Sequence, residues 1–182
     1  MGKNEWAKFK ALLEENGHKC FDLEDDEKIK KRDELIDFIR EFANYRDRIQ
    51  GAEESNVPRV LLERLVSGEE LYDDEVDLTE REIQIKSLKD PGEYSKYGIC
   101  LGDEVIFEEN LQFRRIVDFL LNKYRGGPVP EVFEIPVPQF DKSSNLQKLK
   151  FVKMSRIQFE FIAPQISGRY GEDDLFFEKD SQ

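Results

Sequence analysis

The residues with the clearest chemical potential lie in one acidic stretch near the middle of the chain. The sequence EELYDDEVDLTEREIQIK, residues 69–86, holds eight carboxylates: Glu69, Glu70, Asp73, Asp74, Glu75, Asp77, Glu80 and Glu82. The stretch then alternates, with Ile83 and Ile85 opposing polar neighbours, and this pattern predicts a strand. Carboxylates at such density can hold a divalent cation, imitate the phosphates of nucleic acid, or form a solvated loop without a ligand.

The end of the stretch resembles the catalytic core of restriction endonucleases, in the variant that carries a glutamine and a lysine. A strand places Gln84 and Lys86 on one face, because they lie two residues apart. The resemblance implies that an upstream acid, Asp77 or Glu75 in its place, would hold Mg²⁺ while the lysine assists attack on phosphate. A metal-dependent nuclease is therefore one alternative function. Asp77 lies only seven residues before Gln84, which leaves little room for a separate strand and a return that would bring the two side chains together. We therefore expect Asp77 to lie far from Gln84, on a mobile loop.

A second alternative is a DNA mimic that inhibits a nucleic-acid-binding protein. Carboxylates spaced like phosphates can occupy a basic groove, and further acids occur in DLEDDE and GEDDLFFEKD. However, 28 Lys and Arg are dispersed through the chain, often at helical spacing to acids. Such spacing is typical of an ordinary ion-paired surface, so a solvated acidic loop is the simpler interpretation.

The end of the chain combines acids with three consecutive apolar residues, Leu175, Phe176 and Phe177. Together with Asp174, Leu175 and Phe176 resemble the end of peptides that insert into a pocket of bacterial sliding clamps. The leading glutamine of that pattern is missing here. The alternative is that these side chains pack on the protein's own core, because exposed apolar clusters are costly.

Most familiar catalytic constellations are absent from the sequence. His18 is the single histidine, and Cys20 and Cys100 are the two cysteines, which together fall short of the four ligands of a structural zinc site. A nucleotide-binding glycine loop and an HExxH motif are also missing. We therefore assign no catalytic residue, metal or cofactor outside the nuclease alternative, and favour a protein that is not an enzyme.

Charge indicates the kind of partner. The net charge is −12 at pH 7 and the isoelectric point is near 4.7, so direct binding to a phosphate backbone would meet repulsion. A protein partner with a basic surface fits better. The N-terminal sequence MGKNEWAKFK has no apolar signal region, and no window is apolar enough to span a membrane. These features predict a cytoplasmic protein.

The periodicity predicts an α+β fold, with a helical N-terminal part followed by a small, mostly antiparallel sheet packed against one long helix. We predict helices over 4–17, 25–51, 54–68 and 109–125, and strands over 82–86, 146–154 and 156–164. Residues 97–107 should form two short strands about a turn at Gly102 and Asp103. The proline-rich segment 128–140 should be an edge strand or an extended connection. Helices should dominate residues 4–67, and the sheet should be built from residues 82–162.

The helix at 109–125 should bury Phe113, Ile116, Val117, Leu120 and Leu121. As domains, we predict a helical region at 1–68, an α+β domain at 69–170 and an acidic tail at 171–182. A single compact domain is the alternative.

These features favour a protein-binding protein that acts as an inhibitor, adaptor or regulatory subunit. A role in conflict between phage and bacterial host would suit such a small acidic protein. The expected contact residues are Glu69, Glu70, Asp73, Asp74, Glu75, Asp77, Leu175, Phe176 and Phe177. The resemblances above are local, and the sequence as a whole indicates no known family.

Overall fold

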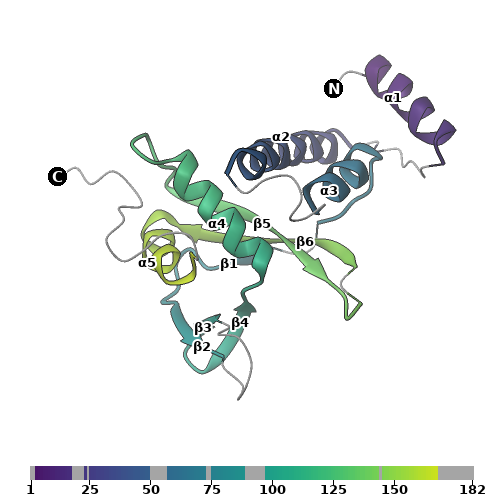
Figure 1. The fold of residues 1–182 in the computed structure, drawn as a ribbon. Helices are drawn as coiled ribbons and strands as arrows, with labels where there is room; N and C mark the ends of the chain where they lie inside the picture. The colour runs from purple at the N-terminus through teal and green to yellow at the C-terminus, as the bar shows by residue number, and fades with distance from the viewer. Residues whose placement is uncertain are drawn as a thin grey trace. The chain divides into compact units, whose positions relative to one another are not determined.

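The computed structural model describes residues 3–17, 23, 25–49, 57–72, 75–88, 97–143 and 145–167 (Figure 1). The fold is α+β, and a helical N-terminal part precedes two three-stranded sheets. This confirms the predicted fold class. The chain divides into two compact units, residues 1–72 and residues 73–182.

The first unit contains α1 (Lys3–Glu15), α2 (Asp26–Ile49) and α3 (Val57–Val66). Asp25 begins α2, because its carboxylate accepts a hydrogen bond of 2.8 Å from the Glu27 backbone N–H. Gly68 follows α3 with a φ of 89°, a left-handed conformation that favours glycine. The helices expected at 4–17, 25–51 and 54–68 are thus present.

The core of the first unit lies between α2 and α3, which pack against each other. The long helix α2 supplies much of it. The buried apolar side chains are Leu35, Ile36, Ile39, Phe42 and Tyr45 on α2, and Leu61, Leu65 and Val66 on α3.

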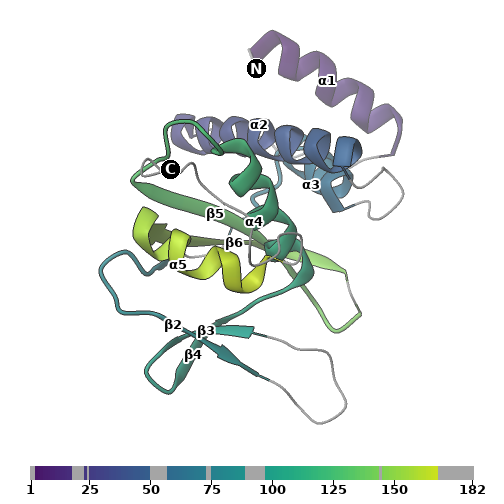
Figure 2. The ribbon, with the colours of Figure 1, turned by 60° about the vertical axis from the view of Figure 1, so that its left-hand side comes forward.

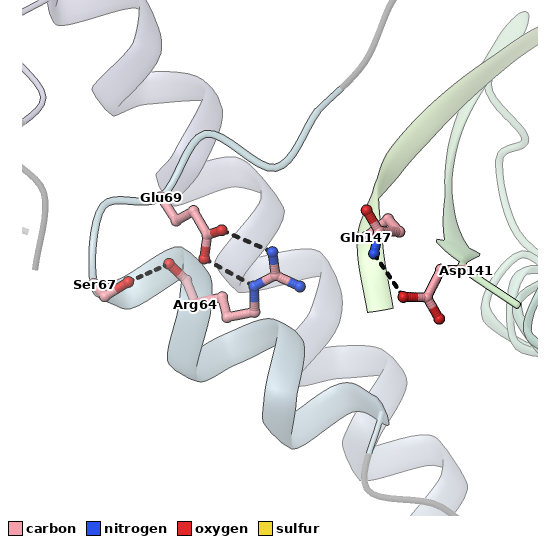
Figure 3. A network of polar contacts seen from close by, with 5 residues as sticks. All are labelled: Arg64, Ser67, Glu69, Asp141 and Gln147. Atoms are coloured by element: carbon pink, nitrogen blue, oxygen red, sulfur yellow. Dashed lines mark hydrogen bonds and ion pairs between the residues drawn. The ribbon is translucent and has the colours of Figure 1, made fainter. Parts of the chain in front are cut away.

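The second unit begins with a sheet in the order β1-β6-β5, formed by β1 (Val76–Asp77), β6 (Leu146–Ser155) and β5 (Val132–Phe140). The central strand β6 pairs antiparallel with β5 and parallel with β1. Because β5 is an edge strand, Pro136 and Pro138 can lie within it, as the prolines predict. Between β5 and β6, Asp141 accepts hydrogen bonds from the backbone of Ser143 and Asn145 and from the Gln147 amide; the last is drawn in Figure 3.

A second, antiparallel sheet contains β2 (Gln84–Ser87), β3 (Tyr97–Leu101) and β4 (Glu104–Glu108). The predicted turn at Gly102 and Asp103 joins β3 to β4, and Gly102 has a φ of 62°. Phe107 of β4 packs edge-on against Phe113, with 5.0 Å between the ring centroids. This contact joins the second sheet to the helix that follows it.

Two helices, α4 (Leu111–Lys123) and α5 (Arg156–Ile166), cover one face of the first sheet (Figure 2). Phe133 of β5 contacts aromatic rings from both helical segments. The centroid of its ring lies 5.7 Å from that of Tyr124, which follows α4, and 4.1 Å from that of Phe159 on α5. The five α4 residues expected in the core are all buried, namely Phe113, Ile116, Val117, Leu120 and Leu121.

The prediction of a strand over 156–164 is wrong, because this segment is helix α5. Ser155 caps the helix by accepting a hydrogen bond from the Gln158 N–H, and the Gln158 side chain accepts one of 2.7 Å from the Ser155 N–H. This reciprocal capping box satisfies two backbone N–H groups at the start of the helix, which in a strand would have to bond to a neighbouring strand. The first sheet therefore ends at Ser155, and strands occur between residues 76 and 155 rather than over 82–162.

Replacing Leu120 by Ala should lower the free energy of unfolding by about 2–5 kcal/mol, because it removes buried methyl groups and leaves a cavity. Urea denaturation measures this loss. Leu111→Ala on the same helix is the matched control, since Leu111 is 56% exposed and should change stability by less than about 0.5 kcal/mol. Equal losses in the two variants would show that α4 does not present this face to the sheet.

Candidate functional site

The first two acids of the acidic stretch form ion pairs within the first unit. Glu69 accepts two hydrogen bonds from the Arg64 guanidinium, of 2.8 and 2.7 Å, while Ser67 donates to the Arg64 carbonyl (Figure 3). Glu70 accepts a hydrogen bond of 2.9 Å from the Lys28 ammonium, and this bond raises the pKa of Lys28. Because both carboxylates are matched by cations of α2 and α3, they do not act as an unpaired negative surface.

Asp77 also has a local structural role. It lies in β1, and its carboxylate accepts hydrogen bonds of 2.9 Å from the Thr79 N–H and 2.7 Å from the Thr79 hydroxyl. These bonds, the hydroxyl first, hold the pKa of Asp77 below its usual range. The expectation that Asp77 lies on a mobile loop is therefore wrong, since it belongs to a strand paired with β6.

Gln84 and Lys86 lie in β2, which belongs to the second sheet, whereas Asp77 belongs to the first. The Lys86 ammonium donates a hydrogen bond of 2.6 Å to the Gly102 carbonyl and lies 3.5 Å from the Asp103 carboxylate. It thereby ties β2 to the turn between β3 and β4. Among the residues that the structure describes, no group of three or more His, Cys, Asp or Glu is arranged to hold a metal ion.

Several of the predicted contact residues lie outside the described part of the chain. These are Asp73, Asp74, Leu175, Phe176 and Phe177. Glu75 and Asp77 are described, and both are exposed.

A buried glutamine holds the turn after β1 in place. The Gln158 amide of α5 donates to the carbonyls of Leu78 and Arg81, the latter at 2.8 Å. The same side chain closes the capping box of α5, so it satisfies polar groups of two segments about eighty residues apart in sequence. The capping-box spacing of Ser155 and Gln158 is visible in the sequence, but the contact with the turn has no local sequence signal.

A second polar cluster surrounds the start of α4. Glu109 is buried, accepts a hydrogen bond of 3.2 Å from the Tyr97 N–H and lies 3.7 Å from the Arg114 guanidinium. Arg114 also donates to the Ile166 carbonyl at 3.0 Å, which fixes the end of α5. Burial raises the pKa of Glu109, although Arg114 and the Tyr97 N–H partly oppose this effect. One acid between a backbone donor and a single arginine is a structural tie rather than a catalytic arrangement.

The apolar face of α1 is the strongest candidate for a contact surface. Helical spacing places Phe9 and Leu12 on one face, and their side chains are 42% and 59% exposed. None of the α1 side chains that the structure describes is buried. The sequence predicts a helix here, and the structure shows that Phe9 and Leu12, among its described side chains, remain exposed.

No protein-family model matches the sequence, and neither the curated proteins nor the solved structures contain a significant match. Of the helices in the described part of the chain, none combines the length and apolar composition that crossing a membrane requires.

The stability contributed by Glu109 should depend on pH. Because its pKa is raised in the folded state, the stability that protonated Glu109 contributes should be lost as the pH rises through that pKa. Glu109→Gln cannot ionise and avoids this loss. Its unfolding free energy relative to the wild type should therefore increase from about pH 4 to about pH 7.

Urea unfolding at several pH values measures this difference. Glu104→Gln, which removes an exposed carboxylate on β4, is the control for the loss of one negative charge. A difference for Glu109→Gln that stays constant or decreases with pH would contradict the assignment.

Proposed function

We propose that the protein binds another protein through the apolar face of α1 and acts in the cytoplasm as an inhibitor, adaptor or regulatory subunit. The observation that carries this proposal is the exposure of Phe9 and Leu12 on α1, a helix in which six of the 13 residues are charged. Covering an apolar side chain of this size stabilises a complex by roughly 1.5–3 kcal/mol. An apolar groove of a partner would provide that cover, as in complexes that accept an amphipathic helix.

Charge supports a partner with a basic surface around such a groove. The net charge of −12 would attract a basic protein over the range of a Debye length and speed its encounter with α1. Glu69 and Glu70 contribute less to this field than the sequence suggests, because Arg64 and Lys28 compensate them. Glu75, Glu80 and Glu82 of the second unit carry exposed carboxylates.

The two alternative functions have less support. A nuclease would need Asp77 and Lys86 at one metal ion, whereas each is hydrogen-bonded to a turn and they belong to different sheets. A DNA mimic would need unpaired carboxylates in a row, whereas Glu69 and Glu70 form ion pairs within the protein.

The double variant Phe9→Asp, Leu12→Asp should lose the partner. Affinity purification of the tagged full chain from its native host, in buffer of low ionic strength, would identify the partner with the wild type. Direct titration should then show roughly 30-fold or greater weakening in the variant, as expected when central apolar contacts are removed.

Leu111→Asp is the matched control, because it places the same charge at an exposed leucine on α4 and should bind as the wild type does. Circular dichroism should show unchanged folding in both variants. Equal affinity of the double variant, or repeated recovery of the wild type alone, would refute the proposal.

A further inference from the structure

A second uncovered apolar face lies on α5, in the second unit. Ile157 and Phe161 are 78% and 50% exposed, and Pro164 is exposed as well. Their spacing of four and then three residues places all three on one side of the helix. The opposite side, with Phe159, is buried against the sheet.

This face is a fixed platform. The capping box of Ser155 and Gln158 holds the start of α5, and the Gln158 amide bonds to the Arg81 carbonyl. At the other end, the Arg114 guanidinium donates to the Ile166 carbonyl. Because α5 is already ordered, a segment that binds its apolar side chains does not have to order the helix as well. This lowers the entropic cost of association.

The sequence itself supplies an occupant of suitable composition. Immediately after Ser167 the chain continues as GRYGEDDLFFEKDSQ, and its only run of consecutive apolar residues is Leu175, Phe176 and Phe177. These residues lie outside the described part of the chain.

The chain is long enough to bring this run onto α5. The eight residues from Ser167 to Leu175 can span up to about 27 Å when extended. The distance along the helix axis from Ile166 back to Ile157 is about 14 Å, at 1.5 Å per residue. The segment can therefore turn back and reach either Phe161 or Ile157.

Charge favours the same direction. A segment that runs back along α5 carries its last acids, Glu178 and Asp180, toward the N-terminal end of the helix. That end has the positive side of the helix dipole and the half-buried Arg156 guanidinium, which also forms an ion pair with Glu160. The positive end of α5 would thus attract Glu178 and Asp180 when the neighbouring apolar residues contact Ile157.

We propose that residues 168–182 dock within the same chain on the outer face of α5, with Leu175, Phe176 and Phe177 covering Ile157 and Phe161. This assigns the three residues to an intramolecular contact instead of the partner contact that the sequence first indicates. The proposal is independent of the partner proposed for α1.

The test is photo-crosslinking in the full chain, with benzoylphenylalanine in place of Phe176. Mass spectrometry should locate the crosslink on α5, within one chain, and its yield should not change with protein concentration. Ile157→Asp combined with Phe161→Asp should lower the yield roughly tenfold or more, because two apolar contacts are lost. Leu111→Asp on α4 is the matched control and should leave the yield unchanged.

Three results would overturn the proposal. Crosslinks between two chains that increase with concentration would assign the face to a second copy. Crosslinks to another part of the same chain, or none, would show that the segment does not cover α5. An unchanged yield in the Asp variant, with its folding verified by circular dichroism, would show that Ile157 and Phe161 are not the contact.

Discussion

The pairing of β6 with its two neighbours determines where most of the second unit lies. β6 pairs with β5 from Leu146 to Ser155 and with β1 at Val152 and Lys153. At Ser155 the strand passes directly into α5, whose capping residue is the last residue of the strand. Gln158 then returns from the helix to the carbonyl of Arg81, beyond β1. Strand β6 and the Gln158 side-chain amide thus position both the turn after Asp77 and the outer face of α5.

Local patterns in the sequence predict much of this fold, whereas distant contacts have no such signal. Helical spacing identifies α2, and it identifies α4 together with its buried face, while the prolines of β5 indicate an edge strand. The segment after Ser155 misleads because Ile157, Phe159 and Phe161 alternate as in a strand, while the helix buries only Phe159 of the three. The capping box is the local signal that distinguishes the two. The contact of Gln158 with Arg81 depends on the assembled fold.

The acidic stretch shows why a density of charge in sequence is a weak indicator of a site. Three of its acids have partners close by: Glu69 with Arg64, Glu70 with Lys28, and Asp77 with Thr79. These three carboxylates stabilise local structure, whereas Glu75, Glu80 and Glu82 of the same stretch are exposed. Apolar side chains that remain exposed are more informative here, because their contact with water is not compensated.

The proposed function requires that the apolar face of α1 lies outside the protein's core and is available to a partner. The most direct test is the unfolding free energy of the free protein with Phe9 and Leu12 both replaced by Ala. If the face is uncovered, stability should change by less than about 0.5 kcal/mol for each substitution. A combined loss of about 4 kcal/mol or more, the size expected for two core residues, would show that these side chains pack within the protein and would contradict the account.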